Sequence, residues 1–164
     1  MWFWGRGSLF LNSAKTSSFN QADINQLVEH LESCDHDFSP PLSQRTDLTR
    51  YADKLFTQAE CFEAWVSGEL VGLVAIYLND EEEELAFISN VSVLRRWQGN
   101  GIASHLLRES LSLARKRRFN VACLNVNAAN SAAITMYEKA GFRHQNLTGE
   151  TLTMKLDLTE ATNE

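Results

Sequence analysis

The feature that most constrains this chain is the segment of residues 87–104, which reads FISNVSVLRRWQGNGIAS. It begins as an apolar strand, passes through a short turn with two glycines, and ends as the start of a helix. Gly99 and Gly101 lack a Cβ, so both can adopt positive φ and let a ligand approach the backbone. A helix start offers unpaired N–H groups and the positive end of the helix dipole. The segment therefore predicts a phosphate-binding turn, with the side chains of Arg95 and Arg96 beside it.

This turn differs from the two common nucleotide-binding loops. A dinucleotide-binding G-x-G-x-x-G would need glycine at position 104, where the chain has Ser104. A P-loop would need Gly-Lys-Ser/Thr, which does not follow here. The alternative to a ligand site is a tight strand-to-helix connection without a ligand.

The pattern Arg96-x-x-Gly99-x-Gly101, entered from the strand end Val91-Ser92-Val93, resembles the signature of the GNAT superfamily of N-acetyltransferases. In that family the loop wraps the pyrophosphate of acetyl-coenzyme A. Residues 121–142 are similar to the family's next strand, its Asn-led helix, its tyrosine and its closing Gly-Phe. The two motifs follow in the right order, about thirty residues apart. The resemblance is specific over residues 85–158 and loose before them.

The resemblance implies an α/β fold with a single GNAT-like domain over residues 1–164. The expected central sheet is mixed but mostly antiparallel, has six to seven strands with a splay in its middle, and is flanked by about four helices. Residues 85–158 would form the cofactor core, and the helices of residues 20–57 would lie on the acceptor side. The chain's 164 residues and 44% hydrophobic content suit one domain with a full core.

The resemblance also implies that acetyl-CoA is the co-substrate. The residues assigned to cofactor binding are Val91, Ser92, Val93, Arg96, Gln98, Gly99, Asn100, Gly101, Ile102, Ala103, Ser104, Asn130 and Tyr137. A strand bulge at residues 88–90 would leave backbone groups free for the thioester carbonyl and the pantetheine amides. Asn130 is also a good helix N-cap residue, so two roles are open for it.

Tyr137 matches the family's proton donor to the departing thiolate, and it is the predicted catalytic residue. A phenol with a reference pKa of about 10 can protonate a thiolate whose thiol has a pKa of about 8.5 in concert with its departure, or after its own pKa is lowered. Hydrogen-bond donation and simple packing are the alternatives. The general base is missing, because Ser89, Asn90 and Asn125 stand where relatives frequently carry Glu. A water-relayed base, or an amine that enters already neutral, could replace it.

The predicted reaction is transfer of an acetyl group to an amine of a small molecule or peptide, by direct attack in a ternary complex. The alternatives are a non-catalytic CoA-binding module, which the missing carboxylate favours, and an acyltransferase with a hydroxyl acceptor. The net charge of −6 argues against nucleic acid and favours a cationic amine. The acceptor would be lined by residues 20–57 and the acidic loop of residues 79–84.

Three cysteines, Cys34, Cys61 and Cys123, form no C-x-x-C pair, which indicates free thiols and a cytoplasmic protein. His30, Cys34 and His36 have no evident fourth ligand, so no metal is predicted, and structural or acceptor-lining roles are favoured for them. The aromatic first twelve residues are broken by Gly-Arg-Gly and predict neither a signal peptide nor a membrane span. A monomer or homodimer is expected.

Hydrophobic periodicity predicts the remaining elements. Helices are expected over about residues 21–31, with a start at Asn20 and Asp23, and over 48–56, 101–117 and 131–140. Strands are expected over residues 8–12, 60–66, 70–78, 85–94, 121–127 and 151–158. Residues 35–42 contain two prolines and are expected to form a loop.

Overall fold

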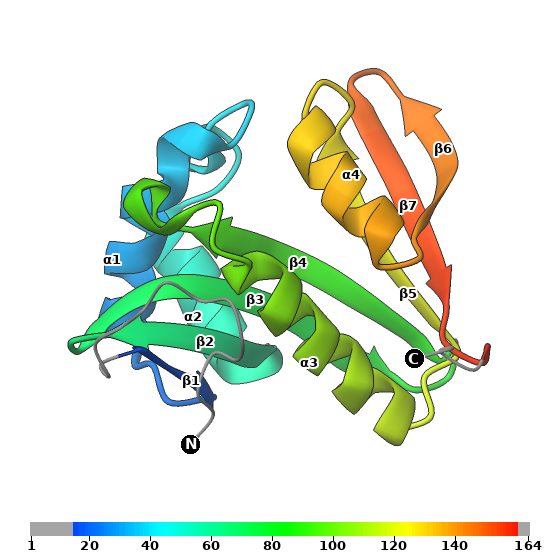
Figure 1. Cartoon of the computed structure of the whole chain (residues 1–164), viewed down its shortest axis with the longest axis horizontal. Coiled ribbons are helices and arrows are strands. Elements are labelled where there is room, and N and C mark those ends of the chain that lie inside the picture. The colour runs from blue at the N-terminus through cyan, green and yellow to red at the C-terminus, as the bar shows by residue number, and fades with distance from the viewer. Residues whose placement is uncertain (1–14, 161–164) are drawn as a thin grey trace.

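The computed structural model describes residues 15–160, in which one mixed sheet carries helices on both faces (Figure 1). The strands are β1 (Lys15–Phe19), β2 (Glu60–Val66), β3 (Glu69–Asp80), β4 (Leu85–Val93), β5 (Val121–Asn127), β6 (Arg143–Thr148) and β7 (Thr151–Asp157). The helices are α1 (Ile24–Cys34), α2 (Leu48–Gln58), α3 (Ile102–Lys116) and α4 (Ser131–Lys139). Three 3₁₀ turns are η1 (Asp35–Asp37), η2 (Leu42–Gln44) and η3 (Arg95–Trp97). The strand order is β1-β2-β3-β4-β5-β7-β6, and the predicted fold class is confirmed.

The sheet opens in its middle, between β4 and β5. These two strands pair in parallel, whereas the other five pairs among the described strands are antiparallel. Their pairing covers only residues 85–88 of β4 and 121–124 of β5. Beyond it, β4 continues beside β3 and β5 continues beside β7, so the two strands diverge (Figure 1). The predicted splay is therefore present.

A bulge lies where the divergence begins. Ala75 of β3 is opposite Asn90 of β4, and the next β3 residue, Ile76, is opposite Ile88. Ser89 is therefore an extra residue on β4. A bulge of this kind bends its strand and leaves backbone groups outside the ladder. It falls within residues 88–90, where the sequence predicted it.

Two hydrophobic cores cover the two faces of the sheet. One joins the sheet to α3 and α4 and includes Leu106 and Leu107 of α3. The other joins the sheet to α1 and α2 and includes Leu31 and Leu55. Figure 1 shows α3 in front of the sheet and α2 behind it. These cores fix the helices on both sides of the opening between β4 and β5.

Gly72 of β3 allows α3 to lie close to the sheet. A Cβ at this position would be 2.6 Å from Cγ2 of Ile102 and 3.3 Å from Cβ of Ala64. Protein interiors are close-packed, so a larger residue would displace Ile102, the first residue of α3. The height of α3 above the sheet therefore depends on this glycine.

The first helix begins three residues later than the pattern of Asn20 and Asp23 suggested. Asp23 is the N-cap of α1: its carboxylate accepts the N–H of Gln26, and the Gln26 side chain accepts the N–H of Asp23. The Asn20 side chain binds the edge of β2 instead, where it accepts the N–H of Cys61 at 2.7 Å. It serves as a turn residue and not as a cap.

Four further features differ from what the sequence predicted or lie outside the described residues. Strand β6 was not predicted, because its side chains are all exposed and show no apolar alternation. Phe56 follows the helical spacing of α2, yet it is exposed. The expected strand of residues 8–12 lies outside the described residues. The expected loop of residues 35–42 includes the η1 turn and the start of η2.

Candidate active site

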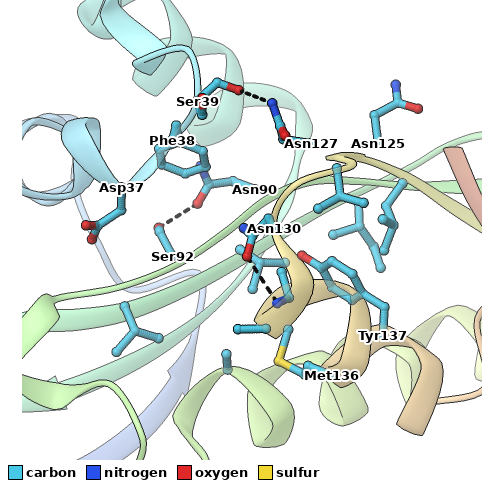
Figure 2. Close-up of a pocket in the computed structure, with 18 of the residues that line it drawn as sticks. Asp37, Phe38, Ser39, Asn90, Ser92, Asn125, Asn127, Asn130, Met136 and Tyr137 are labelled. Carbon is cyan, nitrogen blue, oxygen red and sulfur yellow. Dashed lines mark hydrogen bonds between the residues drawn. The ribbon is translucent and has the colours of Figure 1, made fainter. Parts of the chain in front are cut away.

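A pocket of about 870 Å³ lies where β4 and β5 diverge (Figure 2). Its walls come from the open half of β4, the end of β5, the first turns of α3 and α4, and the loop after η1. The predicted cofactor-binding residues that line it are Val91, Ser92, Val93, Gln98, Gly99, Gly101, Ile102, Ala103, Ser104, Asn130 and Tyr137. The pocket therefore brings together segments that are distant in the sequence.

Arg96 and Asn100 do not line this pocket, although the sequence assigned them to cofactor binding. The guanidinium of Arg96 forms an ion pair with Glu69 at the exposed surface. The Asn100 side chain donates to the carbonyl oxygens of Trp97 and Gln98, at 2.9 Å and 3.2 Å. Both side chains thus shape the glycine turn from outside the pocket.

The glycine turn leads into α3 without a side-chain cap. Gly99 and Gly101 have φ values of 78° and 76°, which are unfavourable for residues with a Cβ. Gly101 is the N-cap of α3, and no side chain accepts a hydrogen bond from its first turn. The N–H groups of this turn lie beside the pocket with the positive end of the helix dipole. This arrangement suits an anionic group such as a phosphate.

The start of α4 forms the neighbouring wall. Asn130 is its N-cap, and its side-chain oxygen accepts the N–H of Ala133 at 3.2 Å (Figure 2). Its predicted capping role is confirmed. The amide nitrogen of the same side chain remains available for a ligand, since Asn130 lines the pocket.

Tyr137 extends from α4 into the pocket (Figure 2). Only 7% of its surface is exposed, and its ring packs edge-on against Phe142 with 5.9 Å between the centroids. Within the described residues its hydroxyl forms no hydrogen bond, which leaves a donor for a ligand. Burial raises the pKa of the hydroxyl above the usual tyrosine value. The option of a lowered pKa is therefore excluded, and Tyr137 stays protonated at neutral pH.

The carboxylates of the pocket are Asp37 and Glu150. Asp37 forms an ion pair with Arg95 at 2.8 Å, and Glu150 lies exposed in the β6–β7 turn. The acidic loop of residues 79–84 was expected to line the acceptor site, but it is not part of the pocket. The reason is its position at the end of β4 where β4 still pairs with β5, away from the opening.

The three polar residues at the positions where relatives frequently carry Glu, Ser89, Asn90 and Asn125, all line the pocket. Asn125 accepts a hydrogen bond from Thr153 at 2.7 Å. Ser89 is held by Tyr51 of α2, whose hydroxyl lies 2.6 Å from the Ser89 hydroxyl and donates to the Ser89 carbonyl at 3.0 Å. Burial raises the pKa of Tyr51 to about 12, so it acts as a neutral support for the bulge.

The sequence predicted that residues 20–57 line the acceptor site, but it singled out none of the residues of this range that close the pocket on the side of α1. Phe38 and Ser39 follow η1 and lie across from β5 (Figure 2). The Asn127 side chain donates to the Ser39 carbonyl at 3.0 Å and so joins β5 to this loop. No motif marks these residues, because their roles depend on a contact across 88 positions of the chain. Arg45, from the same region, also lines the pocket.

Residues 15–160 contain neither a cluster of metal ligands nor a helix suited to span a membrane. No group of three or more His, Cys, Asp or Glu side chains there could hold a metal ion. None of the helices found there has the length and apolar character needed to cross a membrane.

A sheet that splays beside a glycine turn and an uncapped helix start defines a class of α/β proteins with a long ligand cleft between two diverging strands. Comparison with family models identifies the family within that class. Residues 24–142 match the acetyltransferase (GNAT) family, and the chain belongs to it.

The chain is also similar to individual proteins whose names are consistent with this family. The chain is 34% identical over 101 residues to N-acetylaspartate synthetase from Rattus norvegicus, in a match that covers 60% of this chain and 32% of that protein. It thus spans about a third of that relative's length. Its fold is similar to that of the ribosomal-protein-S18-alanine N-acetyltransferase from Escherichia coli, with a TM-score of 0.72, 21% identity, and coverage of 91% of this chain and 97% of that chain. It is also similar to the PaiA N-acetyltransferase from Thermoplasma acidophilum in complex with coenzyme A, with a TM-score of 0.66, 14% identity, and coverage of 87% of this chain and 99% of that chain.

Proposed function

We propose that this protein transfers an acetyl group from acetyl-CoA to the amine of a small molecule or peptide, by direct attack in a ternary complex. The observation that carries the proposal is that one pocket joins the open edge of β4 to the uncapped start of α3. An extended ligand with an anionic end can pair with the open edge of β4 and place its charge at the start of α3.

The residues present fit acetyl-CoA, which supplies the acetyl group as a reactive thioester. None of the described strands pairs with residues 89–93 of β4 on the side of β5, so their backbone groups can bind the amides of the pantetheine arm. A backbone N–H near the bulge can polarise the thioester carbonyl. The N–H groups behind Gly99 and Gly101 can bind the pyrophosphate. Membership of the acetyltransferase (GNAT) family supports the same cofactor.

An amine that also carries a carboxylate is the acceptor class that the charged lining favours. Arg45 lies on the acceptor side of the pocket and is close enough to Tyr51 to lower its pKa against the effect of burial. Its guanidinium can bind a carboxylate, while Glu150 can attract an ammonium group. The names of the rat relative and of the Escherichia coli neighbour both refer to acetylated amino acids or protein alanine, which supports an amine acceptor over a hydroxyl.

A reducing compartment such as the cytoplasm is the proposed place of action. Cys34, Cys61 and Cys123 are free and buried, and none forms a disulfide within residues 15–160. Free buried thiols are typical of proteins that fold in reducing conditions.

The proposed reaction can be tested by mass spectrometry of products formed from acetyl-CoA and a panel of acceptors. The panel contains amino acids, their amides and decarboxylated analogues, peptides with free N-termini, and matched alcohols. We expect acetylated amines, with amino acids preferred to the amides that lack the free carboxylate. Thiol release without any acetylated acceptor, or products from the alcohols alone, would contradict the proposal.

Tyr137→Phe tests the proposed role of the hydroxyl. The change keeps the ring and its contact with Phe142, and it removes only the donor. We expect kcat to fall by about 10- to 10⁴-fold, because the departing thiolate loses a proton or a hydrogen bond. The affinity for acetyl-CoA and the melting temperature should stay near those of the wild type. Because the pKa of Tyr137 is raised, no loss of activity from its ionisation is expected below about pH 10. An unchanged kcat at saturating substrates would remove Tyr137 from the mechanism.

A further inference from the structure

A chain of buried polar side chains runs from the core of the protein to the pocket. His30 of α1 lies with Nδ1 2.9 Å from the Leu70 carbonyl and Nε2 2.8 Å from the Ser92 hydroxyl. The Ser92 hydroxyl lies 2.7 Å from the side-chain oxygen of Asn90 (Figure 2). Ser92 and Asn90 line the pocket, while His30 is only 3% exposed. A histidine without a direct path to solvent is thus connected to the pocket by one hydroxyl.

The number of protons available to His30, Ser92 and Asn90 determines the protonation state of His30. The Leu70 carbonyl can only accept, so Nδ1 carries a proton. The single Ser92 proton cannot serve both Nε2 and an oxygen of Asn90. If it went to Asn90, Nε2 would need its own proton and the buried imidazole would be charged. If the Asn90 amide is turned by half a rotation, its nitrogen donates to Ser92 and Ser92 donates to a neutral His30.

The surroundings of His30 favour the neutral form. Burial lowers its pKa, and this effect exceeds the opposing effects of its hydrogen bonds and of the Glu69 carboxylate on β3. From α1 itself, the Cys34 thiol lies 3.8 Å from Nε2. Burial and the Asp37 carboxylate raise the pKa of Cys34 to about 12, so this neighbour is neutral as well. The Nε2 lone pair is therefore directed at the Ser92 hydroxyl.

We infer that His30, acting through Ser92, accepts the proton that the acceptor amine loses during acetyl transfer. As the amine nitrogen bonds to the thioester carbon, its N–H bond breaks and the proton moves to the Ser92 oxygen. The original Ser92 proton moves at the same time to Nε2 of His30, and the thiolate leaves with the electrons of the C–S bond. Proton return to solvent through Ser92 restores the neutral imidazole. This inference rests on the proposed function.

The relay supplies what the pocket otherwise lacks. Ser89, Asn90 and Asn125 provide no base, Asp37 is engaged by Arg95, and Glu150 lies exposed in the β6–β7 turn. An amine nitrogen becomes much more acidic once it has bonded to the carbonyl carbon, so a weakly basic imidazole suffices at that stage. Ser92 would touch the substrate, whereas His30 would act as a positioning and proton-holding residue behind it.

The pair Ser92→Val and Ser92→Thr isolates the hydroxyl, because the two changes add the same bulk at the same place. We expect Ser92→Val to lower kcat by about 10²-fold or more near neutral pH, with an unchanged KM for acetyl-CoA. The deficit should shrink as pH rises, because more of the amine is then already neutral. Ser92→Thr should recover the wild-type pH profile. His30→Gln should follow Ser92→Val in its pH profile. Ser33→Ala removes an exposed hydroxyl of α1 that lies outside the pocket and does not contact the relay, so it should leave kcat unchanged.

A second measurement does not depend on turnover. The nitrogen chemical shifts of His30 in ¹⁵N-labelled wild-type protein should show a neutral ring with its proton on Nδ1 near neutral pH. A proton on Nε2, or a charged ring, would overturn the relay whatever the activities. If Ser92→Val and Ser92→Thr acetylate amines with equal kcat, the relay is overturned and the proposed function stays intact. Failure of the wild type to acetylate any amine would overturn both.

Discussion

The helices on the two faces of the sheet begin in different ways. On one face, α1 and α2 are capped by the carboxylates of Asp23 and Asp47, which accept first-turn N–H groups. On the other, α3 begins at Gly101 with no side-chain cap, and α4 begins at the neutral amide of Asn130. Only the starts of α3 and α4 line the pocket. The difference teaches that this acidic chain places no carboxylate cap on the two helix starts where an anionic ligand would need to bind.

The largest expected effect comes from giving α3 the kind of cap that α2 has. Gly101→Asp would place a carboxylate at the proposed pyrophosphate site. Two unit charges about 4 Å apart repel by about 4 kcal/mol at an effective dielectric constant near 20. A repulsion of half that size, about 2 kcal/mol, would weaken acetyl-CoA binding by about 30-fold. Titration calorimetry should show this loss, and the thermal stabilisation by acetyl-CoA should disappear.

Gly68→Asp is the matched control for backbone strain. Gly68 and Gly101 have φ values of 80° and 76°, and a Cβ at either position meets nothing within 4 Å. Gly68 does not line the pocket. Both variants should lose similar stability, and only Gly101→Asp should lose affinity. Equal affinity in the two variants would remove the glycine turn from the cofactor site.

A smaller effect is expected at the start of α4. Asn130→Asp keeps a good capping group, so the free energy of unfolding should change by less than about 0.5 kcal/mol. The added charge faces the pocket, and acetyl-CoA affinity should fall by roughly 10-fold. Asn130→Ala should instead change stability more than affinity, because loss of the cap costs about 1 kcal/mol of stability and no charge is added. Denaturant unfolding and calorimetry on the same samples separate the two. If Asn130→Asp binds as tightly as the wild type, α4 does not contribute to the anion site.

The smallest effect on binding is expected at α2. Asp47→Ala removes the carboxylate that accepts the Arg50 N–H at 2.9 Å. It should cost about 1 kcal/mol of stability, or a few degrees in melting temperature, for a domain of this size. The affinity for acetyl-CoA should not change, because Asp47 lies outside the pocket. A clear change in affinity would show that the two faces of the sheet are not independent.

The parts of the molecule that could be predicted are those with a local signal. The glycine turn, the Asn130 cap and the helix of residues 102–116 follow from short segments whose residue types dictate their conformation. The bulge at Ser89 was expected only through the resemblance to a family, since no residue type in β4 marks it. Strand β6 has neither an apolar face nor a motif, and its pairing with β7 was therefore missed.

The parts that could not be predicted depend on contacts between distant residues. His30 precedes Ser92 by 62 positions, and Tyr51 precedes Ser89 by 38. In the sequence, His30 is one histidine on an amphipathic helix, and its connection to the pocket appears only when α1 packs against β3 and β4. The same holds for Arg45 and Phe38, whose place in the pocket is set by the path of the chain between α1 and α2.

Gly72 has a consequence for the engineering of this pocket. It touches no proposed ligand, yet the missing Cβ is what allows Ile102 and the first turn of α3 to approach the sheet. The depth of the anion site is therefore set from behind, by a strand residue on the far side of the helix. A mutant library limited to lining residues would vary the chemistry of the walls and leave the height of α3 untouched. Larger residues at position 72 would push Ile102 and the start of α3 away from the sheet, and so change the distance between the two walls while every lining group stayed the same.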